Sequence, residues 1–244
     1  MKKRTAQFTI ASVAALALLA LGGSALARDQ AGRHEAKAIR LDDATLIVEV
    51  NATDGDAGLQ VFLDGEPWRA MRITGPNGRA ILDVKAQGRL QGHGLTELFS
   101  ESSEPSFDVF PLERFKELFP AGRYSFAGET IDGNRLTGAA TLSHAIPRGP
   151  EIVSPAKGSA LNRANVVARW KRVTEPAGVD IVGYRAIVTR EDPLRILSVD
   201  LPASARKVRI PPEFLERGTQ YKIEVQAIEK SGNQTLTEIA FRVR

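Results

Sequence analysis

The chain has 244 residues, of which 33 are Lys or Arg, 29 are Asp or Glu and none is Cys. Without cysteine there are no disulfides and no thiol nucleophile, so an apolar core must hold the fold unaided. The formal net charge is +4, but positions 2–4 are all basic, and beyond them 30 basic residues face 29 acidic ones. This near balance gives no reason to expect a nucleic-acid partner.

The N-terminus has the pattern of a secretory signal. Basic residues at 2–4 precede an apolar run at 8–21, which leads to the small residues of Ser24–Ala27. A membrane-spanning helix needs roughly 20 apolar residues, and this run is shorter. The sequence therefore predicts a signal peptide at 1–27, cleaved after Ala27. No cysteine follows to carry a lipid, so we expect a periplasmic or secreted protein with no transmembrane segment in the mature chain.

Charge and composition divide the remaining chain. Residues 28–147 carry a net charge of −5, and residues 148–244 carry +6, with a Pro-Arg-Gly-Pro stretch at 147–150 between them. We expect a mobile N-terminal lead at 28–38 and two domains, at 39–147 and 150–244. The opposite charges predict attraction between the halves or an approach to an anionic envelope. Ordinary solvated faces are the simpler alternative.

Strand patterns dominate the first domain. Short β-branched runs occur at 44–50, 59–63 and 80–84, and Asp64-Gly65 and Asn77-Gly78 between them are hairpin signals. One segment, Pro111–Phe119, is typical of a helix, because its apolar side chains recur on one face and Pro120 ends it. The phenylalanines around this helix are expected to close one end of the domain.

The second domain has a more specific pattern. A strand at 164–173 carries Trp170, a second at 180–189 carries Tyr184, and the stretch from Leu215 through Gly218 to Tyr221 leads into alternating apolar positions. This half resembles a fibronectin type III domain, which implies a seven-stranded β-sandwich with Trp170 and Tyr221 in structural roles.

Alternation along 221–227 adds to that resemblance. Tyr221, Ile223, Val225 and Ala227 should face one core, while the intervening Lys222, Glu224 and Gln226 should face solvent. A similar ending occurs in the first domain, where Tyr124 starts a strand that turns at Asp132-Gly133-Asn134. The sequence thus predicts an all-β chain of two tandem immunoglobulin-like or fibronectin type III-like sandwiches after the signal peptide. One short helix is expected, in the first domain.

Sequence motifs for catalysis are missing. There is no Gly-x-Ser-x-Gly elbow, no glycine-rich phosphate loop, and no zinc spacing among His34, His93 and His144. We therefore expect no catalytic residues and no enzyme, and no cofactor other than a possible calcium ion.

The stretch Glu49–Gln60, EVNATDGDAGLQ, could supply that ion. Oxygen ligands from Asn51, Asp54 and Asp56, with Glu49 nearby, suit Ca²⁺, although the spacing is not that of the twelve-residue calcium loop. The alternative is a hairpin turn, for which Asn and Asp-Gly are favoured, and we prefer it.

Trp68 is the other candidate for ligand contact. It could form an exposed platform for a glycan or peptide, or it could lie in the core, which we favour because large aromatic residues bury well. The sequence as a whole predicts an exported, non-catalytic binding, adhesion or scaffold protein of the cell envelope, with an envelope or extracellular protein or glycan as partner. A Ca²⁺- or carbohydrate-binding accessory module using the 49–58 loop or Trp68 is the alternative.

Overall fold

The computed structural model describes residues 36–244. The expected signal peptide and most of the expected lead lie outside this range. Strand structure starts at Ala38, one residue before the expected domain boundary, because β1 (Ala38–Arg40) pairs in parallel with Arg135–Thr137. Among residues 36–244, no helix is long and apolar enough to cross a membrane.

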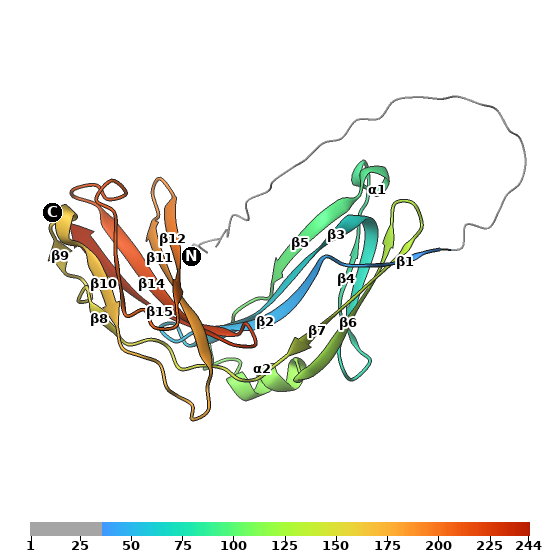
Figure 1. Cartoon of the computed structure of the whole chain (residues 1–244), viewed down its shortest axis with the longest axis horizontal. Coiled ribbons are helices and arrows are strands. Elements are labelled where there is room, and N and C mark those ends of the chain that lie inside the picture. The colour runs from blue at the N-terminus through green and yellow to red at the C-terminus, as the bar shows by residue number, and fades with distance from the viewer. Residues whose placement is uncertain (1–35) are drawn as a thin grey trace, which may run out of the picture. The chain divides into compact units, whose positions relative to one another are not determined.

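The N-terminal half, residues 36–147, consists of strands with two short helices (Figure 1). In chain order the elements are β1, β2 (Asp43–Asn51), β3 (Asp56–Thr74), β4 (Ala80–Lys85), α1 (Leu90–His93), β5 (Leu95–Glu101), α2 (Leu112–Leu118), β6 (Gly122–Thr130) and β7 (Arg135–Leu142).

Strand β3 organises this half. Its first part pairs with β2 and β5, and its second part pairs with β4 and β6, with register shifts between Asp64 and Ala70. The hairpin turn predicted at Asp64-Gly65 is wrong, because both residues lie inside this 19-residue strand. A Cβ at Gly65 would lie 2.9 Å from Leu41 Cδ2, so close packing accounts for this glycine. The turn predicted at Asn77-Gly78 is confirmed between β3 and β4.

The apolar core of the N-terminal half is formed by β2, β3, β6 and β7, with Phe115 of α2 packed into it. Alternate residues of β2, Leu46, Val48 and Val50, point into it. The predicted helix is confirmed as α2, whose Phe115 is buried and lies 5.0 Å from Phe119 between ring centroids. The expectation of a single helix is wrong, since the four-residue α1 also forms.

The C-terminal half, residues 148–244, contains eight strands and a 3-10 turn. In chain order they are β8 (Ile152–Ser154), β9 (Ala160–Leu161), η1 (Arg163–Asn165), β10 (Val167–Trp170), β11 (Ile181–Arg190), β12 (Arg195–Pro202), β13 (Lys207–Arg209), β14 (Gln220–Glu229) and β15 (Gln234–Val243).

These strands form the predicted sandwich. The three-stranded sheet β13-β10-β8 packs against β15-β14-β11-β12, and the core between them contains Trp170, Tyr184 and Tyr221. The Tyr221 hydroxyl accepts a hydrogen bond from Glu216 N at 2.7 Å and lies 3.4 Å from Phe214 O, which ties the strand to the loop before it. The structural role predicted for Tyr221 is confirmed.

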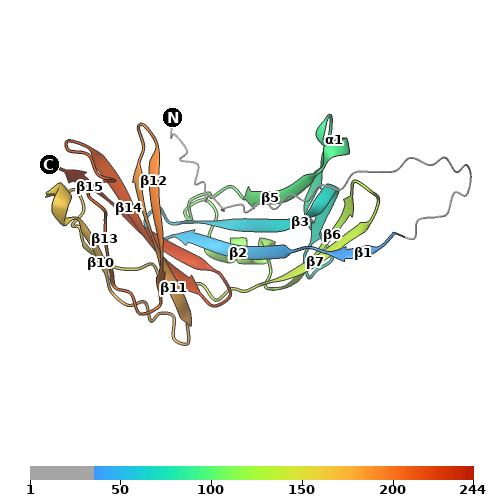
Figure 2. The ribbon, with the colours of Figure 1, turned by 45° about the horizontal axis from the view of Figure 1, so that its top comes forward.

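One sheet continues from the first half into the second (Figure 2). Its main path runs β1-β7-β6-β3-β2-β15-β14-β11-β12, so β2 has β3 on one edge and β15 on the other. Glu49–Asn51 of β2 pair in parallel with Gln234–Leu236 of β15. We call this pairing, with the side chains around it, the joint.

Candidate functional site

The Glu49–Gln60 stretch forms the predicted hairpin, with residues 52–55 as its turn. The side-chain oxygen of Asn51 accepts hydrogen bonds from Thr53 N at 2.9 Å and Asp54 N at 3.1 Å, and its amide nitrogen donates to Asp54 Oδ2 at 3.3 Å. The structure therefore brings Asn51 and Asp54 together, but in a turn-stabilising role that uses both lone pairs of the Asn51 oxygen.

Asp56, the third predicted calcium ligand, starts β3. Its backbone pairs with Asn51 and also forms a bridge with Ser106. The geometry thus gives the calcium assignment no support from Asn51, and calcium binding by Asp54 and Asp56 stays a prediction.

Trp68 is in the core. Its exposed fraction is 0%, and its indole nitrogen donates to Thr96 O at 3.3 Å. An exposed ligand platform at Trp68 is therefore wrong, and the core position favoured from the sequence holds. Because β3 continues through residues 64–68, Trp68 is held within a paired strand and not in a surface turn.

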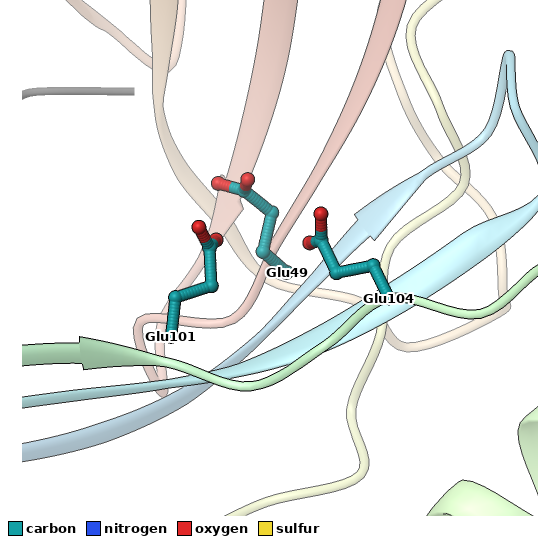
Figure 3. A group of neighbouring side chains, drawn as sticks. All are labelled: Glu49, Glu101 and Glu104. Carbon is teal, nitrogen blue, oxygen red and sulfur yellow. The ribbon is translucent and has the colours of Figure 1, made fainter. Parts of the chain in front are cut away.

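Acidic side chains gather at a different place, on the face of β2 that points away from the N-terminal core. Glu49 of β2, Glu101 at the end of β5 and Glu104 in the following loop each offer a carboxylate oxygen, and these atoms lie within 4.8 Å of one another. Figure 3 shows Glu49 on β2, and Glu101 and Glu104 on the continuous stretch formed by β5 and the loop that follows it. We call this group the carboxylate cluster.

Gly58 makes room for this arrangement. It pairs with Glu49 across the β2–β3 ladder, and a Cβ at this position would lie 2.6 Å from Glu104 Oε1. Any larger residue would displace the Glu104 side chain. The absence of a side chain at 58 therefore lets Glu104 approach Glu49.

Glu49 is the unusual member of the carboxylate cluster. Only 3% of it is exposed, whereas Glu101 and Glu104 are exposed. Burial, together with the charges of Glu101 and Glu104, raises the pKa of Glu49 to about 8, and the hydrogen bond from Gln234 acts in the opposite direction. Such a group can hold a proton where an ordinary glutamate would have lost it.

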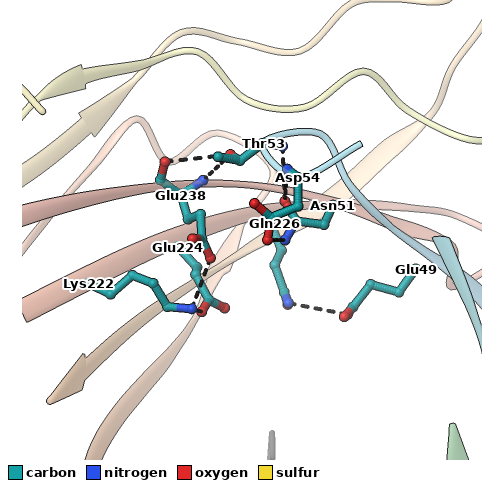
Figure 4. Close-up of polar contacts among 8 residues, drawn as sticks. All are labelled: Glu49, Asn51, Thr53, Asp54, Lys222, Glu224, Gln226 and Glu238. Carbon is teal, nitrogen blue, oxygen red and sulfur yellow. Dashed lines mark hydrogen bonds and ion pairs between the residues drawn. The ribbon is translucent and has the colours of Figure 1, made fainter. Parts of the chain in front are cut away.

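The partners of Glu49 come from the C-terminal half. Gln226 Nε2 donates to Glu49 Oε2 at 3.3 Å (Figure 4). Gln234 Nε2 donates to the same oxygen. Two strands of the second sandwich, β14 and β15, therefore contact a carboxyl group of the first.

The polar face of β14 is consequently not a solvent face. Glu224 is 3% exposed and Gln226 is 2% exposed, which overturns the prediction that these residues face water. The reason is that the first half covers this face at the joint. Lys222 pairs here with Glu224 and Glu238 at 3.2 and 2.9 Å. Burial alone would lower the pKa of Lys222, but these two carboxylates raise it.

Asn233 completes the joint. It is fully buried, its Oδ1 accepts from Val48 N at 2.8 Å, and its Nδ2 donates to Ser143 O at 2.8 Å and Ala145 O at 3.2 Å. One side chain from the second half thus satisfies three backbone groups of the first. Thr53 adds a further contact, because its hydroxyl accepts from Glu238 N at 2.8 Å.

The sequence analysis noted Glu49 but did not identify Glu101, Glu104 or Gln234 as its neighbours. It also missed the three hydrogen bonds by which Asn233 connects the two halves. One signal was available. Glu49 stands in an otherwise apolar strand, ATLIVEV, on the face opposite Leu46, Val48 and Val50, so a second partner could have been expected on that face.

Two cavities lie away from the carboxylate cluster. One of about 160 Å³ borders Tyr184 and Asp180, and an open one of about 420 Å³ borders Asp43 and Gly138. Neither contains a member of the cluster.

Comparison with known proteins found no matching family model and no matching curated protein. Solved structures do match. The FN1–FN3 domains of chicken CNTN1 align with a TM-score of 0.33 and 11% identity over 85% of this chain and 66% of that one, just under two thirds of its length. A two-domain fibronectin type III segment of chicken tenascin aligns with a TM-score of 0.30 and 10% identity, over 83% of this chain and 98% of the segment.

These neighbours are fibronectin type III proteins, the family that residues 150–244 resemble. The β-sandwich architecture of the present chain rests on its own strands, registers and two cores.

Proposed function

We propose that this chain is an exported, non-catalytic binding and scaffold protein of the cell envelope. Its two β-sandwiches would be held in one relative position and would present surfaces of both to a protein or glycan partner. The observation that carries the proposal is the joint, in which a shared sheet and the buried Asn233 connect two separate cores.

The physical reason is preorganisation. A partner that contacts two domains at once gains affinity when the domains need not be ordered on binding. A loose linker would lose that gain, whereas a continuous sheet retains it. Export is supported by the basic, apolar and small-residue pattern at 1–27, which predicts a mature chain starting at Arg28.

Photo-crosslinking in the living cell tests the proposal. A photoreactive residue replaces Phe99 on β5 or Ile196 on the edge strand β12, which are 52% and 38% exposed and lie in different halves. We expect both positions to give an adduct with the same partner in the envelope fraction, and Asn233→Ala to weaken both. An uncleaved, cytosolic protein would contradict export, and adducts unaffected by Asn233→Ala would contradict a composite surface.

The calcium alternative has its own test. A thermal melt in chelator is compared with one in millimolar Ca²⁺ and one in millimolar Mg²⁺, since an ion that binds only the folded state raises the midpoint. A calcium-specific rise that disappears in Asp54→Ala would support it, and coincident curves would contradict it.

A further inference from the structure

The joint contains a buried acid at the point where the two halves meet. Glu49 is the first residue of β2 to pair with β15, and its side chain lies on the face that the C-terminal half covers. The strand pairing and the surroundings of this carboxyl group are therefore parts of one contact.

Hydrogen bonding leaves a place for a proton on Glu49. The amides of Gln226 and Gln234 both donate to Oε2. Because Oε2 receives both donors, Oε1 is the oxygen that can carry a proton while the hydrogen bonds across the joint remain in place.

The charged groups that face Glu49 are mostly acidic. Glu101 and Glu104 approach it from β5 and the following loop, and Glu224 from β14 disfavours its ionised form as well. Lys222 of β14 is paired with Glu224 and with Glu238 of β15. Strand β3 places Gly58 opposite Glu49 and Asp56 two residues before it. Ionised Glu49 would therefore add a negative charge to a buried and already acidic place.

We propose that protonated Glu49 holds the joint closed and that ionisation of Glu49 opens it, so that the relative position of the two sandwiches depends on pH. The proton is lost to solvent, and the resulting carboxylate is rehydrated when β2 and β15 separate. The two cores remain folded, because neither core includes Glu49.

The direction follows from the raised pKa. Between the ordinary value of 4.5 and about 8, closed Glu49 keeps a proton that the open or unfolded chain has released. The closed state therefore loses stability as pH rises through this window, and the loss is complete above about pH 8. Within the window, each pH unit shifts the ratio of closed to open molecules by up to about tenfold.

Spin-label distance measurement tests this proposal without any binding partner. The chain has no cysteine, so Ser125→Cys on β6 and Ser198→Cys on β12, both exposed, provide one label in each half. We expect a narrow distance distribution near pH 6 and a broader one near pH 9.5, conditions on either side of the raised pKa. Lys222 keeps its charge throughout, since its pKa is raised from 10.5.

The variant Glu49→Gln tests whether ionisation of Glu49 causes the broadening at high pH. Glutamine keeps the size and an oxygen that accepts from both amides, but it cannot ionise, so the distribution should stay narrow at both pH values. Glu97→Gln, an exposed position on β5, is the matched control and should behave like the parent. In the double variant Glu101→Gln, Glu104→Gln, two negative charges beside Glu49 are gone, so the pKa of Glu49 should fall. The loss of closed-state stability with rising pH should therefore be smaller and should end at lower pH.

Two outcomes would overturn the proposal. One is a parent distribution that, in chelator, does not change with pH, and the other is equal broadening in Glu49→Gln. A melt of each variant near pH 6 establishes that it is folded. The proposed partner binding is read by crosslinking alone, so either proposal can fail without the other.

Discussion

Strand β14 buries both of its faces, but with opposite chemistry. On one face Ile223 and Val225 are fully buried in the apolar core of the C-terminal half, and on the other Glu224 and Gln226 are buried at the joint. Apolar burial is favourable whatever the neighbours' orientation, at about 25 cal/mol per Å². Burial of a polar group is favourable only when the group has a hydrogen-bond partner. The contact at the joint therefore depends on the exact placement of its partners, whereas the contact in the apolar core does not.

The largest effect should come from the apolar face. Ile223→Ala removes a fully buried side chain and leaves a cavity, so we expect a loss of about 2–5 kcal/mol in the free energy of unfolding. Urea denaturation measures this loss. Ile196→Ala, on the exposed edge strand β12, is the matched control and should change stability by less than about 0.5 kcal/mol. Equal losses would contradict the assignment of Ile223 to the core.

Asn233→Ala should come next and should act on the joint. It leaves the buried Val48 N and two partly buried carbonyl groups without their partner, which we expect to cost about 2–3 kcal/mol and to broaden the distance between labels in the two halves. Asn134 occupies the corresponding turn of the first half, where its side chain accepts one bond, from Lys37 N. Asn134→Ala should therefore cost less and leave the interdomain distance unchanged.

Tyr221→Phe should have a smaller effect. It removes the hydroxyl that accepts from Glu216 N but keeps the stacked ring beside Phe241, so a loss of about 1 kcal/mol is expected from urea denaturation. Tyr124, whose hydroxyl donates to Pro120 O at 2.9 Å, is the counterpart in the first half. If the two tyrosines have the same role, Tyr124→Phe should lose a similar amount.

Gly58→Ala should have the smallest effect on stability, but it should change how stability depends on pH. The added Cβ displaces the flexible Glu104 side chain, so the cost near pH 6 should be below about 1 kcal/mol. With Glu104 farther away, the pKa of Glu49 falls, and the loss of stability with rising pH should end at lower pH. Melting temperatures measured across a range of pH would show this. An unchanged dependence of the melting temperature on pH would mean that Glu104 does not contribute to the raised pKa of Glu49.

Local periodicity explains which features could be predicted from the sequence. The hairpin at 49–60, the helix at 111–119 and the alternation that buries Tyr221, Ile223 and Val225 all depend on residues close together in the chain. The joint does not. Glu49 and Gln234 are 185 positions apart, and nothing in the stretch KIEVQA indicates that its polar face will be covered.

At Trp68 and the Asp64-Gly65 pair, too, contacts with other strands override the local sequence signal. Asp-Gly is a strong turn signal by itself, but β3 continues through it because neighbouring strands pair on both sides of the bulged segment and Leu41 packs against Gly65. The carboxylate cluster likewise required β5 and its following loop to be placed beside β2, which no local pattern specifies.

The long separation of β2 and β15 along the sequence has a consequence for biogenesis. Strand β2 is made long before the partner for its second edge, which begins at Gln234, so the edge at Glu49–Asn51 stays open until β15 has emerged. Open strand edges are templates for wrong pairing. The charged Glu49 and the tight Asn51 turn at this edge would discourage another nascent chain from pairing there before β15 arrives.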